Sequence, residues 1–187
     1  MTDEPLRILM VCTANQCRSP LAEVIARRDL AARGVDAVVV SAGLLAGGRP
    51  AAKGSRKVAK ELGLDLSDHV SRTFDTDTVE AADVIITMGA SHVLELSTRV
   101  PSCTERTLTL RELARFVSTE GRRGPLDRTA VVDEVHRATD RPLAALLEGG
   151  LDVEDPIGMP TARFRRTGQE LTELIGTVLD VWFPRLG

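Results

Sequence analysis

Short runs of apolar and β-branched residues alternate along this chain with longer stretches in which apolar residues recur at helical spacing. The short runs predict strands at residues 8–12, 38–40, 84–88 and 107–110. The helical spacing predicts helices at about residues 19–33, 51–62, 91–96, 110–119, 130–139 and 161–183. Such alternation is typical of a parallel sheet with crossover helices on its faces. We therefore predict a single-domain α/β fold, a three-layer sandwich in which helices flank a four-stranded parallel sheet.

The size, charge and cysteine content restrict the class of protein further. With 187 residues and 43% hydrophobic content, the chain suits one domain, residues 1–187, with a sizeable core. A formal net charge of −3 gives no indication of nucleic-acid binding, and no apolar run approaches the roughly 20 residues of a membrane span. The acidic start of the sequence lacks the basic and apolar regions of a signal peptide. Three cysteines cannot form a complete disulfide framework, so we expect a cytoplasmic protein.

The stretch from Cys12 to Ser19, which reads CTANQCRS, carries the strongest functional signal. It follows the first predicted strand, and Ser19 and Pro20 suit the N-cap and the first position of the next helix. Unpaired backbone N–H groups and the positive end of the helix dipole meet at such a junction, which favours a bound anion and a cysteine thiolate. Arg18 can direct two N–H donors onto a phosphate-like dianion. A strand-end cysteine is usually core packing, but this combination indicates a phosphate-binding loop and cysteine-dependent phosphatase chemistry.

The segment from Val11 to Pro20 resembles the signature of the low-molecular-weight protein tyrosine phosphatase family. Further motifs follow in the family's order at residues 41–43, 69–72, 82–88 and 155–156, so the resemblance extends along nearly the whole chain. The same scaffold is shared by bacterial protein arginine phosphatases and thioredoxin-coupled arsenate reductases. Residues 111–150 form a longer segment than compact members of the family need. We predict a helical insertion there, which is either a lid or partner-docking surface, or a surface elaboration without a role in the chemistry.

Cys12 is the predicted nucleophile. It would attack phosphorus in line and form a phosphocysteine intermediate. Arg18 and the loop amides would hold the phosphate oxygens, so the phosphate-binding residues are predicted to be Thr13, Ala14, Asn15, Gln16, Cys17 and Arg18. Asp155 matches the family's acid position, and we expect it to protonate the leaving group and then to accept a proton from the hydrolytic water.

Several residues are predicted to support this loop. The Ser19 hydroxyl can donate to the Cys12 thiolate, and Asn15 suits the left-handed backbone conformation that a tight loop needs. The family resemblance adds Ser41 and His69 as partners that hold Asn15.

The resemblance also implies a reversible disulfide between Cys12 and Cys17. An arsenate reductase of this family would need a further cysteine pair to relay electrons, and the remaining cysteine, Cys103, stands alone, so we reject that activity. The three histidines are scattered and show no zinc-binding spacing. We expect neither a metal nor another cofactor.

The sequence leaves more than one substrate class open. Tyrosine-directed members usually carry aromatic residues directly after the Asp-Pro pair, whereas this chain has Ile157 and Gly158. That Asp-Pro-x-Gly form and residues 163–167 resemble the arginine phosphatases, which differ in having threonine where this chain has Gln16. We expect Gln16 and Ile157 to line the substrate pocket. A phosphotyrosine protein is the first candidate, and phosphoarginine or a small phosphorylated metabolite is the alternative. Inorganic phosphate and vanadate should bind the site, and a non-catalytic phosphate-binding module is the third interpretation.

Overall fold

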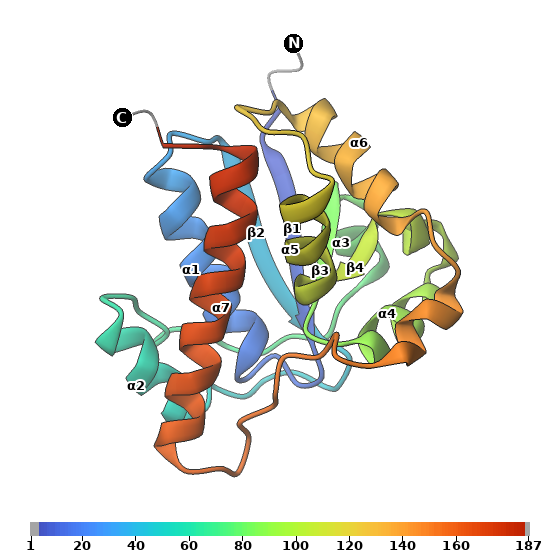
Figure 1. The fold of residues 1–187 in the computed structure, drawn as a ribbon. Coiled ribbons are helices and arrows are strands. Elements are labelled where there is room, and N and C mark those ends of the chain that lie inside the picture. Colours follow the sequence, from blue (N-terminus) through green and yellow to red (C-terminus); the bar gives the residue numbers. More distant parts are fainter. Residues whose placement is uncertain (1–3, 186–187) are drawn as a thin grey trace.

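The centre of the molecule is a four-stranded parallel sheet. The computed structural model describes residues 4–185, apart from the side chains of residues 147 and 148. The sheet has the order β2-β1-β3-β4, and helices lie on both of its faces (Figure 1). Its strands are β1 (Leu6–Cys12), β2 (Ala37–Gly43), β3 (Val84–Thr87) and β4 (Thr107–Thr109). This architecture confirms the predicted three-layer α/β fold.

The helices form one layer on each face of the sheet. They are α1 (Arg18–Ala31), α2 (Lys53–Glu61), α3 (Thr76–Glu80), α4 (Ala90–Arg99), α5 (Leu110–Thr119), α6 (Arg128–Thr139) and α7 (Thr161–Trp182), with 3₁₀ turns η1 (Pro101–Arg106) and η2 (Leu143–Glu148). Helices α1, α2, α5, α6 and α7 share one apolar core, whereas α3, α4 and η1 cover the opposite face. No helix within residues 4–185 combines the length and apolar character needed to cross a membrane.

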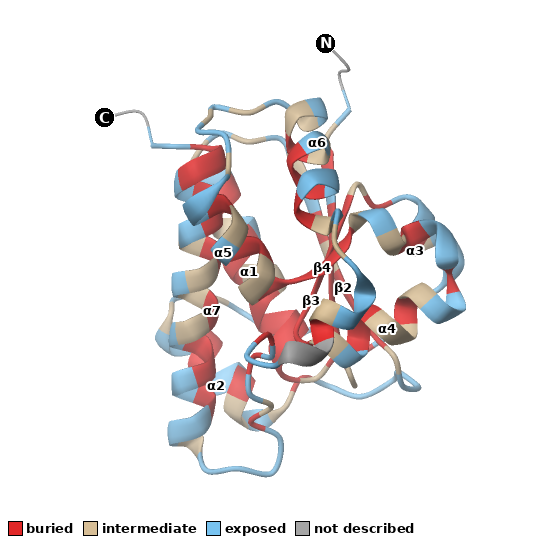
Figure 2. Ribbon diagram, turned by 45° about the vertical axis from the view of Figure 1, so that its right-hand side comes forward, coloured by how far each residue is buried: buried red, intermediate tan, exposed pale blue. Residues whose placement is uncertain are grey.

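The central strand β1 is buried on both faces, as expected for a parallel sheet between two helical layers. Ile8 and Met10 point into the larger core, while Leu9 and Val11 point into the smaller one. Figure 2 shows the resulting buried stripe along the strands and along the inner faces of α1 and α7. Cys12 continues the series of Ile8 and Met10, so its side chain lies on the same side of the sheet as α1.

Several predicted boundaries differ from the observed ones. Strand β2 continues to Gly43, beyond the predicted end at residue 40, so the motif at residues 41–43 belongs to the strand. Helix α1 begins at Arg18 with Cys17 at the N-cap, which makes the N-cap prediction for Ser19 wrong. The physical reason is that the Ser19 hydroxyl bonds to side chains of the loop instead of to a helix N–H group. Helix α3 was not predicted, because five residues are too few to show a helical period.

The segment in which we predicted an insertion contains α5, α6 and η2. Helix α6 packs against η1, β4 and α5. The turn η2 places Leu146 in a small apolar cluster with Val93 of α4 and Leu151. The insertion itself stays a prediction, but these contacts show how residues 143–151 are joined to α4, which begins at the carboxyl edge of the sheet.

Candidate active site

The predicted phosphate-binding loop lies at the carboxyl ends of β1 and β2, the edge where open parallel sheets bind ligands. Cys12 is the last residue of β1, and residues 13–17 connect it to the start of α1. The N-terminus of α1 has no side-chain cap. Within the described part of the chain, the N–H groups of residues 13–17 donate to no backbone carbonyl. Free N–H groups beside a helix N-terminus form a site that favours an anion.

Asn15 fixes the shape of this loop. Its φ of 52° is in the left-handed region, which asparagine tolerates better than most residues. Its buried Nδ2 donates to Ser19 Oγ at 2.9 Å and to Ser41 Oγ at 2.8 Å. Its Oδ1 accepts from the Arg72 backbone N–H at 3.0 Å. The amide side chain is therefore held from three directions, by α1, β2 and the segment before α3.

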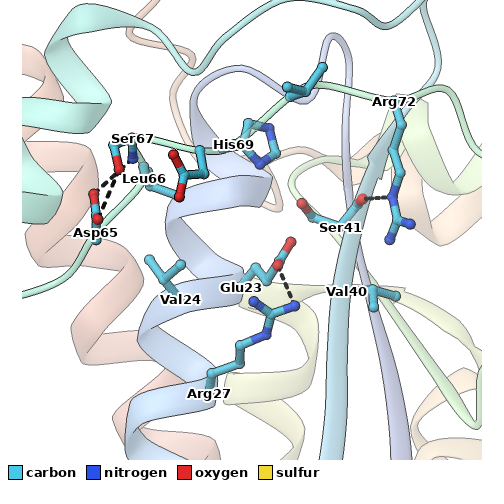
Figure 3. Close-up of a pocket in the computed structure, with 12 residues that line it drawn as sticks. Glu23, Val24, Arg27, Val40, Ser41, Asp65, Leu66, Ser67, His69 and Arg72 are labelled. Atoms are coloured by element: carbon cyan, nitrogen blue, oxygen red, sulfur yellow. Dashed lines mark hydrogen bonds and ion pairs between the residues drawn. The ribbon is translucent and has the colours of Figure 1, made fainter.

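Two side chains from the segment between α2 and α3 also stabilise the loop and the adjoining strand β2. His69 Nε2 lies 2.8 Å from the Asn15 carbonyl oxygen, and Arg72 Nε donates to the Ser41 carbonyl at 2.7 Å. Figure 3 shows His69, Ser41 and Arg72 on one side of a groove of about 550 Å³, with Arg27 on the other. The structure thus places Ser41 and His69 at Asn15, where the family resemblance put them. The contact from Arg72 was missed, because a backbone N–H leaves no signal in a sequence.

The two cysteines of the loop have different surroundings. Cys12 Sγ lies 3.0 Å from Ser19 Oγ. Asn15 donates to the same oxygen, so the Ser19 proton has two acceptors, the Cys12 sulfur and the Ala42 carbonyl at 3.4 Å. The sulfur is the nearer of the two, and a proton directed at it stabilises a thiolate. In contrast, burial, followed by the charge of Asp155, raises the pKa of the Cys17 thiol to about 12. Cys17 is consequently a protonated thiol at neutral pH, and both cysteines are free.

Arg18 lies over the loop with its side chain only 8% exposed. Nη1 donates to the Val153 carbonyl at 3.1 Å, and Nη2 donates to Thr13 Oγ1 at 3.2 Å and to Asp155 Oδ2 at 2.5 Å. Nε is buried and has no partner among the described residues. A buried guanidinium N–H without a partner is costly. Nε and the Nη2 now held by Asp155 are the donors available to an anion in the loop.

Of the three neighbouring acidic residues, Asp155 is the one placed at Arg18. Its other oxygen accepts from the Ile157 N–H at 3.1 Å, which fixes the carboxyl at the start of the turn. Asp152 instead accepts from the Ala90 N–H at 2.8 Å, and Glu154 pairs with Arg163. Asp155 is therefore the one of these three acidic residues whose carboxyl contacts the arginine of the phosphate-binding loop.

The two residues predicted to line the substrate pocket are placed differently. Gln16 is half-buried, and its carbonyl accepts from the Ala52 N–H at 2.8 Å, which ties the loop to the start of α2. Ile157 is 54% exposed beside Asp155. Gln16 lies within the loop, whereas Ile157 follows Asp155 by two residues and presents an apolar side chain to solvent.

Sequence reasoning missed His92. It is buried in α4, and its Nε2 lies 3.0 Å from Thr13 Oγ1. Burial, reinforced by the charge of Arg18, lowers the pKa of His92 to about 4, so the ring is neutral at physiological pH. One signal could have found it: His92 follows the carboxyl end of β3 by five residues, and that end lies at the same edge of the sheet as Cys12.

A thiol and an arginine at opposite ends of an anion-binding loop, on a parallel α/β sheet, define a phosphatase. A family model described as low molecular weight phosphotyrosine protein phosphatase matches residues 7–124. The "Probable low molecular weight protein-tyrosine-phosphatase EpsP" of Ralstonia nicotianae is 33% identical over 96% of this chain and 94% of its own length. This chain belongs to the low molecular weight phosphotyrosine protein phosphatase family.

Other relatives show that the family includes several activities. A protein-arginine-phosphatase of Geobacillus stearothermophilus is 30% identical over 94% of this chain and 95% of its own. An arsenate reductase of Halalkalibacterium halodurans matches about half of this chain. The crystal structure of the low molecular weight protein tyrosine phosphatase from T. tengcongensis is similar with a TM-score of 0.71 and 32% identity, over 94% of this chain and 98% of that one.

Proposed function

We propose that this phosphatase hydrolyses phosphotyrosine in proteins through a phosphocysteine intermediate. The observation that carries the proposal is the arrangement of three groups around one loop. Cys12 is 3.0 Å from a hydroxyl that can stabilise its thiolate, and Arg18 and Asp155 meet at 2.5 Å at the mouth of the same loop. Nucleophile, anion clamp and proton donor are thus within reach of one bound phosphate ester.

In the first step, the Cys12 thiolate attacks phosphorus and a sulfur–phosphorus bond forms. The bond between phosphorus and the ester oxygen breaks, and Asp155 gives its proton to the departing phenoxide. In the second step, Asp155, now a carboxylate, takes a proton from water. The water oxygen attacks phosphorus, the sulfur–phosphorus bond breaks, and the electron pair returns to Cys12 while inorganic phosphate leaves.

Arg18 and the free loop amides supply electrostatic stabilisation. In a phosphoryl transfer the negative charge is spread over the three equatorial oxygens, so fixed donors around them account for most of the catalysis. The ion pair between Arg18 and Asp155 has to separate when a phosphate arrives. The dianion would replace the carboxylate at Nη2. The released Asp155 carboxylate would take up a proton from solvent and, as the acid, turn toward the ester oxygen.

Two observations favour phosphotyrosine as the substrate: the name of a relative, and an exposed apolar side chain beside Asp155. The relative from Ralstonia nicotianae bears a tyrosine-phosphatase name. Exposed Ile157 lacks the aromatic ring expected of tyrosine-directed members, but it still offers an apolar surface to a phenyl ring. Phosphoarginine is the second candidate, because the relative from Geobacillus stearothermophilus is named a protein-arginine-phosphatase. Arsenate reduction is disfavoured, because Cys103 is buried and lies in η1, far along the chain from the loop.

The first experiment is phosphate release from p-nitrophenyl phosphate, without metal and with reductant, by the wild type and by Cys12→Ser. We expect the variant to lose turnover and to keep binding phosphate, since the loop and Arg18 remain. Vanadate should inhibit the wild type. A wild type that binds vanadate without releasing phosphate would favour a phosphate-binding module over an enzyme.

The second experiment measures kcat/KM for matched phosphotyrosine and phosphoarginine peptides. We expect the phosphotyrosine peptide to be the better substrate. Ile157→Phe adds an aromatic ring at the mouth, so it should raise the preference for phosphotyrosine up to about tenfold through ring stacking. A wild-type preference for phosphoarginine would instead assign the chain to the second candidate activity.

A further inference from the structure

His92 is a buried polar side chain close to the site for which the proposed reaction gives no role. It belongs to α4, 79 residues along the chain from Thr13, and is 4% exposed. Its Nε2 contacts Thr13 Oγ1 at 3.0 Å, while Nδ1 is buried without a partner in the described part of the chain. A buried imidazole that leaves one nitrogen unpaired is costly, and an apolar residue would fill the same space without that cost.

Thr13 connects His92 to Arg18. The Thr13 hydroxyl accepts a hydrogen bond from Arg18 Nη2 at 3.2 Å. A hydroxyl has two lone pairs and one proton, so it can hold Arg18 and His92 simultaneously whichever ring nitrogen carries the proton. With His92 in place, the hydroxyl has two fixed partners and its rotamer is determined from both sides.

The other end of the Arg18 guanidinium is linked to the turn that leads from β3 into α4, the same turn that precedes His92. Arg18 Nη1 donates to the Val153 carbonyl, and the Val153 N–H donates to the Met88 carbonyl at 3.0 Å. Two residues further on, the Ala90 N–H donates to Asp152. The turn from β3 into α4, residues 88–92, thus holds both ends of the guanidinium, one through Val153 and the other through His92 and Thr13.

We propose that His92 is a positioning residue, which acts through Thr13 to hold the Arg18 guanidinium where it binds the substrate phosphate. The inference rests on the proposed phosphatase reaction. A neutral ring suits this role, because a second cation beside Arg18 would repel it. Burial and the Arg18 charge keep the pKa of His92 at about 4 and so keep it neutral.

Two substitutions separate this role from simple packing. His92→Gln places an amide group near the position of Nε2, the atom that contacts Thr13, whereas His92→Asn places its amide near Nδ1, which has no partner. We expect His92→Asn to lower kcat/KM for p-nitrophenyl phosphate and the affinity for vanadate by about tenfold each. His92→Gln should stay within about threefold of the wild type. His136→Asn, at the exposed histidine of α6, is the matched control and should change neither value.

A double-mutant cycle tests whether the effect passes through Thr13. Thr13→Val removes the hydroxyl but keeps the shape, so in that background His92→Asn should cost little more, and the two losses should be far from additive. Equal values for the Asn and Gln variants, or additive losses in the cycle, would overturn the proposal. Vanadate affinity gives this comparison without turnover. An inactive wild type would therefore contradict the proposed reaction only. The vanadate affinities of the variants would still decide whether His92 positions Arg18.

Discussion

Gly43 shows how tightly single residues pack around the phosphate-binding loop. A Cβ added to Gly43 would lie 2.9 Å from the Ala14 carbonyl carbon and from the Asn15 nitrogen, both backbone atoms. The backbone of β2 therefore touches the loop directly, and a glycine is needed there for space. The loop keeps its shape because β2 fits against its outer side, in addition to the bonds that hold Asn15.

We therefore expect Gly43→Ala to push the loop outward. The free energy of unfolding should fall by about 1–3 kcal/mol through overpacking, and turnover of p-nitrophenyl phosphate should fall more than tenfold. Urea denaturation and steady-state kinetics measure both effects. Gly176→Ala is the control: it lies within α7 with open space around it, so it should raise stability by about 1 kcal/mol through helix propensity. A fully active Gly43→Ala would contradict the close packing.

Asp155 has two predicted functions that a single substitution separates. Asp155→Asn removes the proton donor, so kcat/KM for a phosphotyrosine peptide should fall about a hundredfold. It also removes the carboxylate that now holds Arg18 Nη2, so phosphate should bind at least as tightly as in the wild type. Glu154→Gln, at an exposed neighbour, should stay within about twofold of the wild type. Weaker phosphate binding by Asp155→Asn would show that the carboxylate organises Arg18 and does not compete for it.

Helix α6 buries a carboxylate, Glu134, that forms ion pairs with Arg122 and Arg137. Glu134 is fully buried and accepts from the Arg122 N–H and Nε at 2.8 and 3.0 Å, and from Arg137 at 2.5 Å. Burial alone would raise the pKa of this carboxyl, but the bonds from Arg122 and Arg137 outweigh burial and lower it. The cluster ties the turn before α6 to the helix itself.

We expect Glu134→Ala to lower the free energy of unfolding by about 2 kcal/mol, because the Arg122 N–H loses its acceptor while both arginines can still reach water. Asp133→Ala, an exposed neighbour 3.7 Å from Arg122, should change stability by less than about 0.5 kcal/mol. Equal stabilities in a chemical denaturation series would contradict the assigned role of the cluster.

The elements differ in how well the sequence predicts them. The four strands are recognisable because parallel strands buried on both faces read as short, nearly continuous apolar runs. The loop from Cys12 to Ser19 is recognisable because its functional residues follow one another directly in the sequence. His92 and the Arg72 backbone contact were missed, because they reach the loop from other elements and only the packing of the sheet brings them there. The start of α1 was misplaced because the Ser19 hydroxyl contacts Cys12 and does not cap the helix.

The pH dependence of stability belongs to the whole molecule. The pKa of His92 is about 4 in the folded protein, well below its ordinary value of 6.5, because of burial and the Arg18 charge; Asp152 and Asp155 oppose the shift. Between these two values the unfolded chain binds a proton that the folded protein does not. Stability from this group is therefore complete above about pH 6.5 and is lost as the pH falls toward 4, by on the order of 3 kcal/mol.

His92→Gln removes the titrating group and should remove this part of the acid destabilisation. Urea denaturation of the wild type and the variant at pH 7.5 and at pH 4.5 measures it. We expect the difference in unfolding free energy between the two proteins to shift in favour of the variant at the lower pH. The same difference at both pH values would show that His92 titrates normally in the folded protein.

The most direct test of the account is to trap the phosphorylated enzyme. Wild type and Asp155→Asn are mixed with p-nitrophenyl phosphate, quenched in acid within milliseconds, and digested for mass spectrometry of the peptide that contains Cys12. We predict one phosphoryl group on Cys12, with more of it in Asp155→Asn. p-Nitrophenolate is a good leaving group that needs little help from an acid, so the missing base should slow the second step more than the missing acid slows the first. Turnover without phosphate on Cys12, or turnover that survives Cys12→Ser, would contradict the proposed mechanism.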